Sequence, residues 1–471
     1  MSAEPPSKDS YQTRLDQFYE TMKLSAALGQ RFLAKRSRPS SDASSEVNTQ
    51  RRFLNNLAFL CDHRRDSSFK ISIAIESADD LSRFWIAADT EPRDNALRCL
   101  NFILSLLKRV LGLPERLLHH GEDLLQGVCA NLAKSRLSLE VEDLSIAVKD
   151  CQPVLLKLNH PDLEDLPEWL GQLDLETNQD RNNLTWCRVA HEAQEYEAMD
   201  KLNSITGVSD MPVLTLPFVQ LRHSIRCLAR QFQACKDLIE DGAKLKGLLL
   251  SKFHVRMVPP PEPVPPPKPD PNTNFDVVAR RLIETTPLRR EIEAAFLRFK
   301  KSHPDIEERI KKQYGEGMAV PRVPSEVQIL EHFYKNHLKY SMGESFIGIS
   351  KPSCLCSQAY FRHHPAASVS PSTNGELCQS WSPTMVQEGR SDENILLQNK
   401  LLEKVHSDIR QRVLQRILQV DQLGVSDGAF DEGAAGEKSA DADHPGLDRH
   451  ESKEDWLFVP DESDEEGGIS V

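Results

Sequence analysis

The sequence predicts a helix-rich α+β fold. Two observations carry this prediction: a pair of short apolar runs with strand periodicity between residues 69 and 88, and long stretches with helical apolar spacing on either side of them. At 471 residues the chain exceeds one average domain, so we expect two folded units with tails. Its 29 prolines indicate that part of the chain is linker.

The N-terminal part predicts helices and one hairpin. A helix and a linker are expected over residues 1–50, because apolar residues recur at helical spacing over 9–36 before a Ser/Arg-rich stretch interrupts them. Residues 51–90 predict a helix followed by a hairpin. Within them, 69–76 alternates apolar with smaller or polar residues, and 83–88 is a second apolar run. Two aspartates between these runs supply turn chemistry, so the runs are expected to pair.

A long helical insertion is predicted over residues 91–255. Five stretches in it carry apolar residues at three- and four-residue spacing: 97–110, 116–132, 141–158, 186–202 and 219–250. Residues 256–274 form a proline-rich linker, which we expect to be an extended spacer. A core segment with further helices is predicted over 275–390, and an amphipathic helix over 391–420.

The acidic balance of the chain belongs to its C-terminal tail. Residues 421–471 hold 16 Asp and Glu against 3 Lys and Arg, a net charge of −13 that equals the charge of the whole chain. The other residues, with 55 charges of each sign, are therefore neutral. A neutral body does not predict tight binding to long duplexes, which depends on phosphate neutralisation. We expect the tail to be disordered and its apolar knot, Trp456 to Val459, to dock into a groove of a protein partner.

Nothing in the sequence predicts secretion or a membrane span. The N-terminus lacks a basic-then-apolar signal, and the longest apolar stretch, 100–113, is too short and is broken by charges. The ten cysteines follow no framework spacing, so we expect reduced thiols and an intracellular protein, cytoplasmic or nuclear. The amphipathic helix at 393–420 is expected to pack on its own domain, with a partner-binding seam as the alternative.

Two helix starts near residues 325 and 354 place reactive side chains close together. Ser325 is expected to cap the first helix, just ahead of Glu326. A short buried strand at 346–349 leads to a proline and Ser353, which predict a second helix start near Cys354. A carboxylate at one helix start and thiols at the next can assemble a zinc site with a proton shuttle, because a helix N-terminus favours the thiolate.

The local sequence resembles a known family. The segments PSEVQILEHF, FIGISKPSCLC and NGELCQSW, which begin at residues 324, 346 and 374, resemble the nucleic acid/nucleotide deaminase-like family found widely in fungi and related to bacterial toxin deaminases. In that family the segments read approximately HAEVQLLEHF, YIGxSKPSCxxC and HGKLYxxW. The runs at 69–76 and 83–88 also resemble the opening hairpin of the family.

The resemblance implies a fold and a chemistry. It implies a cytidine deaminase-like mixed α/β core that a long helical insertion interrupts. It also implies a zinc ion that activates water for attack on cytosine or adenine, with Glu326 as the proton shuttle. The partner of such an active protein would be a nucleotide or a single-stranded nucleic acid.

Several ligand positions depart from the family pattern. The histidine of the family falls on Pro324, which has no ligand atom, and its second cysteine falls on Ser357, a poor zinc donor. Its later histidine falls on Asn374. Glu326 and Cys354 are retained.

Few other side chains could replace the missing zinc ligands. Cys356 lies two positions after Cys354, so on a regular helix the two thiols point to nearly opposite sides. His332 and His363 lie too far along their helices. Cys378, in the loop that follows, remains a candidate, which leaves Cys354, Cys356 and Cys378 as the candidate metal ligands.

Three hypotheses follow from the sequence. The first is a deaminase-like fold that has lost zinc-dependent chemistry and acts as a binding or scaffolding module. The second is a working zinc deaminase with altered ligands. The third is a purely helical interaction protein that binds protein partners through the 393–420 helix or the knot from Trp456 to Val459.

Overall fold

The computed structural model divides the chain into two compact units. It describes residues 8–28, 45–65, 69–78, 81–90, 93–158, 165–174, 181–207, 212–265, 274–283, 289–314, 320–341, 344–385 and 392–423. Unit 1 comprises residues 1–41, 259–336 and 353–443, and unit 2 comprises residues 42–258, 337–352 and 444–471. The two units therefore alternate along the chain, and the predicted core segment 275–390 contributes to both.

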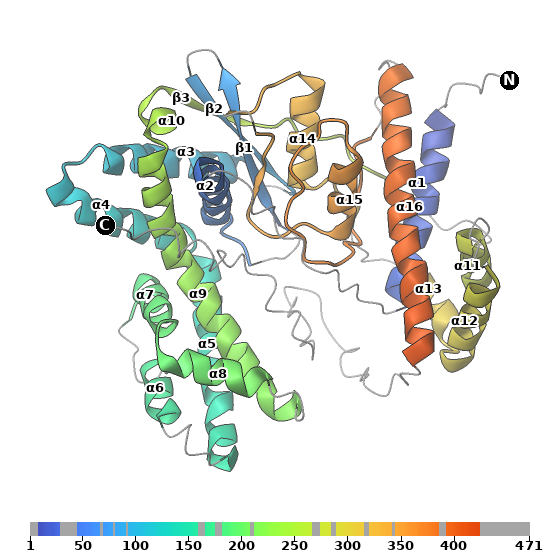
Figure 1. Cartoon of the computed structure of the whole chain (residues 1–471), viewed down its shortest axis with the longest axis horizontal. Helices are drawn as coiled ribbons and strands as arrows, with labels where there is room; N and C mark the ends of the chain where they lie inside the picture. Colours follow the sequence, from blue (N-terminus) through green and yellow to red (C-terminus); the bar gives the residue numbers. More distant parts are fainter. Residues whose placement is uncertain are drawn as a thin grey trace. The chain divides into compact units, whose positions relative to one another are not determined.

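Unit 2 contains a four-stranded mixed sheet in the order β3-β2-β1-β4 (Figure 1). Strands β1 (Ile71–Ala78) and β2 (Leu81–Ala88) form the predicted antiparallel hairpin, with Ile73 opposite Ile86. Strand β4 (Gly348–Ile349) pairs antiparallel with β1. A sheet shared by the hairpin and the later motif segment confirms the α+β prediction and argues against the purely helical hypothesis.

Strand β3 (Phe253–Met257) was missed by the sequence prediction, which ended a helix at residue 250 and began a linker at 256. The sequence Phe-His-Val-Arg-Met does alternate, and its burial alternates with it. Because β3 runs parallel to β2, the chain needs a long crossover between the two strands. The helical insertion provides that crossover.

The insertion contains the helices α3 (Arg93–Leu111), α4 (Glu115–Leu132), α5 (Lys134–Leu158), α6 (Leu166–Gln172), α7 (Asn183–Ala193), α8 (Glu197–Gly207), α9 (Pro212–Lys244) and α10 (Lys246–Leu250). Two details differ from the sequence prediction. The single helix predicted over 186–202 is two helices, α7 and α8, separated by a turn. Helix α6 lies outside the five predicted stretches, and its proline fits the first helical turn.

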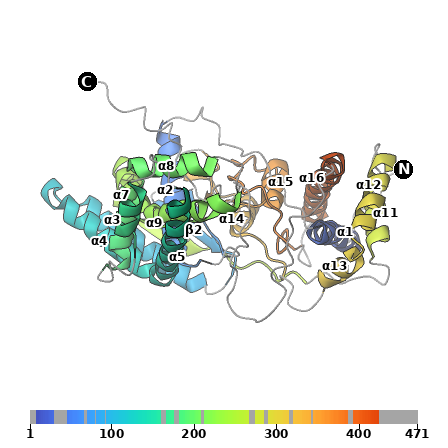
Figure 2. The same cartoon turned by 90° about the horizontal axis from the view of Figure 1, so that it is seen from below.

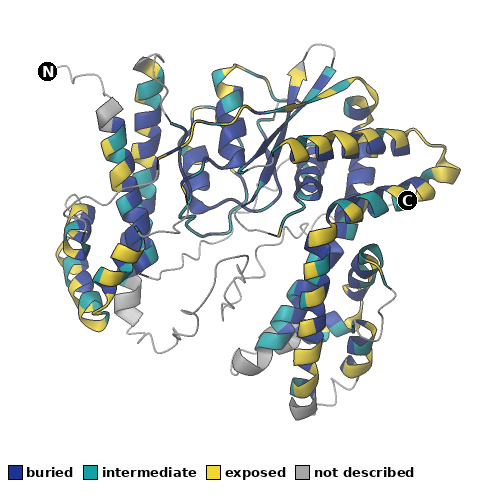
Figure 3. Cartoon of the chain, turned by 180° about the vertical axis from the view of Figure 1, so that it is seen from behind, coloured by how far each residue is buried: buried dark blue, intermediate teal, exposed yellow. Residues whose placement is uncertain are grey.

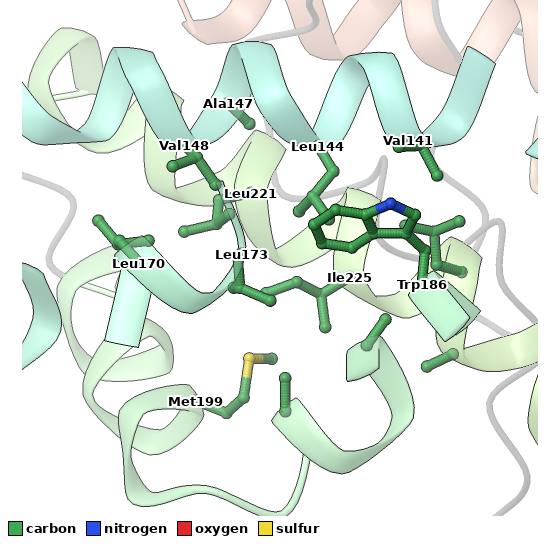
Figure 4. Close-up of a cluster of buried hydrophobic side chains, with 14 of the residues drawn as sticks. Val141, Leu144, Ala147, Val148, Leu170, Leu173, Trp186, Met199, Leu221 and Ile225 are labelled. Carbon is green, nitrogen blue, oxygen red and sulfur yellow. The ribbon is translucent and has the colours of Figure 1, made fainter. Parts of the chain in front are cut away.

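The insertion has its own hydrophobic core. Trp186 of α7 points into a cluster with Val141 and Leu144 of α5 and Ile225 of α9, all of them buried (Figure 4). The helices pack here because their apolar residues fall on one stripe, as the spacing predicted.

Helix α2 (Ser45–Cys61) packs on β1, β4 and α9 and anchors the motif strand. The backbone N–H of Ile349 donates to Asn55 Oδ1 at 3.0 Å, and Ser350 Oγ donates to Asp62 Oδ2 at 2.7 Å. Lys351 Nζ donates to the carbonyls of Arg64 at 3.2 Å and Phe69 at 2.9 Å. The sequence Ser-Lys of the motif therefore has a structural role in unit 2. Most of the β1–β2 hairpin, against which this motif strand pairs, is buried (Figure 3).

Unit 1 is helical in its described parts. Its helices are α1 (Lys8–Ala27), α11 (Phe275–Ile283), α12 (Arg289–Ser302), α13 (Ile306–Lys312), α14 (Ser325–Lys335), α15 (Leu355–His363) and α16 (Asp392–Leu423). Helix α16 contacts α1, α12 and α15, and both views place it between α15 and α12 (Figures 1 and 2). Its apolar face is buried within the unit: Leu402, Val405, Ile409, Val413 and Ile417. The helix therefore packs on its own domain, as expected, and this face is not a free partner-binding seam.

Some predictions fall on residues that the structure does not describe. The acidic tail beyond residue 423 and the knot from Trp456 to Val459 lie outside the described residues, as do residues 266–273 of the proline-rich linker. Among the described residues, no helix is both long and apolar enough to cross a membrane.

Replacing Gly348 with alanine is expected to destabilise unit 2 by about 1–3 kcal/mol, the usual cost of overpacking. A Cβ at Gly348 would lie 2.5 Å from the Leu54 carbonyl carbon and 2.6 Å from the Leu54 oxygen, which are backbone atoms that cannot move aside. Urea unfolding followed by circular dichroism measures the change.

The matched control is Gly247→Ala in α10, where the added Cβ meets no atom within 4 Å. That variant should keep or gain stability, by up to about 1 kcal/mol. Equal midpoints for the parent and Gly348→Ala would contradict this close-contact argument.

Candidate functional site

The candidate site lies at the starts of α14 and α15. Helix α14 begins after Pro324, whose φ of −59° and ψ of 148° place it just outside the helix, and α15 begins after Cys354 with φ −80° and ψ 168°. The expected cap at Ser325 is wrong: Ser325 is the first helical residue, and Pro324 occupies the cap position without a side-chain hydrogen bond. The second start was predicted correctly, with Cys354 at its cap position.

Residues 372–382 pair with the backbone just before α14 and just before α15, and so join the two helix starts. The first part of this segment pairs with the residue before Cys354: Ser353 N donates to Ser372 O at 2.8 Å, and Asn374 N donates to Ser353 O at 2.9 Å. Its second part pairs with Arg322, which receives a hydrogen bond from Ser382 N at 2.9 Å. Because backbone pairing fixes direction and spacing, residues 372–382 hold the two motif helices together at their N-terminal ends.

Glu326 is fully buried in the first turn of α14. Its Oε1 accepts a hydrogen bond from Ser353 Oγ at 2.8 Å. Its Oε2 has no hydrogen-bond partner among the described residues. A buried carboxylate oxygen without a partner is costly, so it marks a site where a ligand, a water or a proton is needed. The helix N-terminus favours the negative charge there.

Ser357, at the position of the second cysteine of the family, is occupied by protein contacts. Trp381 Nε1 donates to Ser357 Oγ at 3.1 Å, and the Cys354 thiol donates to the same oxygen at 3.8 Å. Trp381 is itself buried, 5.4 Å from the Phe18 ring and 6.0 Å from the Tyr360 ring between centroids. The hydroxyl therefore serves as an acceptor that anchors the indole.

The remaining candidate ligands face other partners. Cys356 Sγ lies 3.9 Å from Met22 Sδ of α1. Cys378 Sγ lies 3.1 Å from Ser380 Oγ. His363 Nε2 lies 3.0 Å from Asp408 Oδ2. Within the described part of the chain, no three His, Cys, Asp or Glu side chains form a group that could hold a metal ion.

Asn374, at the position of the later histidine of the family, closes its own turn. Its Oδ1 accepts a hydrogen bond from Glu376 N at 3.0 Å, a local pattern typical of asparagine. The donor set as a whole does not fit a catalytic zinc ion, which takes three protein ligands of the N, S or carboxylate type. Glu326, with its Oε2 free of hydrogen bonds among the described residues, and the Cys354 thiol are the two groups here that match what the resemblance implies.

A second buried carboxylate, Glu331, was not found by sequence reasoning. Its Oε1 accepts hydrogen bonds from Tyr360 Oη at 2.5 Å and Gln398 Nε2 at 3.0 Å, and His364 Nε2 lies 3.1 Å away. Lys335 Nζ lies 2.6 Å from Oε2. These partners come from α14, the end of α15 and α16, so Glu331 joins three helices of unit 1.

The partners of Glu331 determine its ionisation. Burial raises the pKa of Glu331, but hydrogen bonds from His364, Lys335 and Tyr360 together with the Lys335 charge outweigh burial and lower the pKa to about 2. Burial in turn raises the pKa of Tyr360, which stays a neutral donor. Glu331 is therefore a charged structural hub at neutral pH.

Comparison with known proteins covers the same region. Residues 323–385 match a family model described as "OTT_1508_deam:-like deaminase". Residues 323–385 are deaminase-like. No curated protein and no solved structure matches the chain. The deaminase-like segment coincides with the stretch in which residues 372–382 hold the starts of α14 and α15 together.

Replacing Glu331 with glutamine is expected to lower the free energy of unfolding at neutral pH and to make it change less as the pH falls into the acid range. The folded-state pKa of about 2 lies below the ordinary 4.5, so the charge of Glu331 stabilises the fold fully above pH 4.5, and this contribution is lost as pH falls toward 2. The shift corresponds to about 3 kcal/mol. Urea unfolding of the parent and of Glu331→Gln is measured between pH 6 and pH 3. The difference between their unfolding free energies should become smaller as the pH falls.

The control for Glu331→Gln is Glu308→Gln, at an exposed position in α13 of the same unit. It should change the unfolding free energy by no more than about 0.5 kcal/mol at any pH tested. A gap between the parent and Glu331→Gln that stays constant from pH 6 to pH 3 would refute the assignment of Glu331 as a charged hub.

Proposed function

We propose that this chain is a deaminase-like protein that has lost zinc-dependent chemistry and acts as a binding or scaffolding module. The observation that carries the proposal is the hydrogen bond from Trp381 Nε1 to the Ser357 hydroxyl. Ser357 stands at the position where the family has a thiolate ligand. Pro324, at the position of the histidine ligand, offers no donor atom. Cys354 is left as the one ligand of the expected kind at the site.

The chemistry of the site supports this proposal. A neutral hydroxyl is a poor zinc donor, and the hydroxyl of Ser357 already interacts with Trp381 and Cys354. Cys356 lies against Met22 of α1, and its thiol belongs to no group of metal-ligating side chains among the described residues. The stability of the site comes instead from hydrogen bonds and ring packing, which need no metal.

A binding role agrees with how unit 1 is built. The apolar face of α16 is buried inside the unit, so a partner that uses this helix would contact its polar face. The knot from Trp456 to Val459 remains a second proposed contact for a protein partner.

Zinc analysis of the full chain tests the proposal. Protein purified from zinc-supplemented culture should hold well below one zinc per chain by elemental mass spectrometry, because one thiol alone binds the ion weakly. The matched control is the double variant Pro324→His, Ser357→Cys, which restores the donor types of the family pattern and should bind more zinc. Thermal unfolding of the variant checks that it folds. One tightly held zinc in the parent chain would overturn the proposal.

A second candidate function, an active nucleobase deaminase, draws on one observation. Glu326 is fully buried, and its Oε2 has no partner among the described residues, as a proton shuttle awaiting a substrate would require. Ammonia release from nucleosides or single-stranded nucleic acid would support this candidate if Glu326→Gln abolished it. Equal release by the parent and Glu326→Gln, or none across a broad panel of bases, would exclude it.

A further inference from the structure

A polar pocket lies between the end of α15 and one face of α16. It has a volume of about 290 Å³ and is lined by Arg362, Asp408, Gln411, Arg412 and Gln415. The four α16 residues follow spacing of three and four, so they share one helical face. This face differs from the buried apolar face, which contains Val405, Ile409 and Val413. The pocket is therefore a feature of the solvent side of unit 1.

The charge in the pocket is arranged by one carboxylate. Asp408 Oδ2 lies 2.9 Å from Arg362 Nη1 and 3.0 Å from His363 Nε2, so it orients the Arg362 guanidinium. Among the described residues, no side-chain hydrogen bond or ion pair involves Arg412, Gln411 or Gln415. Two guanidinium groups and one carboxylate line the pocket, which gives its lining side chains a net charge of about +1.

We infer that this pocket binds a phosphate monoester. The free guanidinium of Arg412, the remaining edge of Arg362 and two carboxamide groups supply several N–H donors on one face. A phosphate monoester carries three acceptor oxygens and a charge of about −1.5 to −2, which matches several donors and an excess of positive charge. The volume of the pocket leaves room for part of the group that the phosphate is attached to.

Other ligand classes fit the pocket less well. A cation would be repelled by the two guanidinium groups. The single carboxylate of the pocket, Asp408, is already paired with Arg362. A carboxylate has two acceptor oxygens and a single negative charge, whereas a phosphate monoester has three oxygens and a charge of about −1.5 to −2, so a carboxylate engages the donors of the pocket less fully. An apolar ligand would bury the charges without replacing their water.

The test measures binding of defined phosphate probes to the full chain. Isothermal titration calorimetry is run with inorganic phosphate, ribose 5-phosphate and O-phosphoserine, and with sodium acetate as the carboxylate probe. Ribose 5-phosphate and O-phosphoserine distinguish a sugar phosphate from a phosphorylated side chain as the source of the group. Binding of at least one phosphate probe, with acetate at least about tenfold weaker, is the expected result.

Variants assign the binding to this pocket. Arg412→Gln should weaken phosphate binding by at least about tenfold, the loss expected for a charge-assisted contact. Gln415→Ala, which keeps the charge, should weaken it by about threefold, since one neutral donor is removed. The control Arg289→Gln removes an exposed arginine of α12 that pairs with Glu293, and it should leave binding unchanged.

Three outcomes would overturn the inference. They are no binding of any phosphate probe, acetate binding as tight as phosphate, and phosphate binding that Arg412→Gln leaves unchanged. Thermal unfolding of each variant checks its fold, and since Arg412 and Gln415 lie on the solvent side of α16, both variants should melt within a few degrees of the parent.

Discussion

The candidate site depends on the backbone pairing that holds the starts of α14 and α15 side by side. Residues 372–382 pair with Ser353 at one end and Arg322 at the other, which brings two helix N-termini to one place. Two positive helix ends favour a negative charge beside them, and the buried carboxyl group of Glu326 lies in the first turn of α14. The hydrogen bond from Ser353 then stabilises the carboxylate and ties α14 to α15 a second time.

Helix α14 carries two buried carboxylates with different surroundings. Glu331 has partners at both oxygens, and these partners lower its pKa, as in a structural ion network. Glu326 has a partner at one oxygen only within the described part of the chain. The difference between the two residues lies at Oε2, which in Glu331 has the Lys335 ammonium at 2.6 Å and in Glu326 has neither a hydrogen bond nor an ion pair among the described residues.

The sequence predicted those features of the fold and the site that local patterns encode. The hairpin followed from alternation and turn residues, and the second helix start followed from the residues before Cys354. The role of Glu331 could not be predicted, because His364 and Gln398 lie 33 and 67 residues away and no local pattern links them. The cap at Ser325 was predicted wrongly because proline, with its fixed backbone, took the cap position instead. Strand β3 was missed although its alternation was visible, since five residues beside a proline-rich stretch gave a weak signal.

The residues that agree with the family pattern and those that depart from it have different physical roles. Ser350 and Lys351, which agree, hold the end of α2 and the residues just before β1 through hydrogen bonds that are buried at Ser350 and partly buried at Lys351, so their loss would leave unsatisfied polar groups. Ser357, which departs, anchors the indole of Trp381 and leaves the fold intact without a thiolate. Requirements for folding persist whether or not a metal is bound, whereas ligand positions are free to change once the chemistry no longer needs them. A chain that keeps the first set and changes the second is the outcome expected when the scaffold is used for binding.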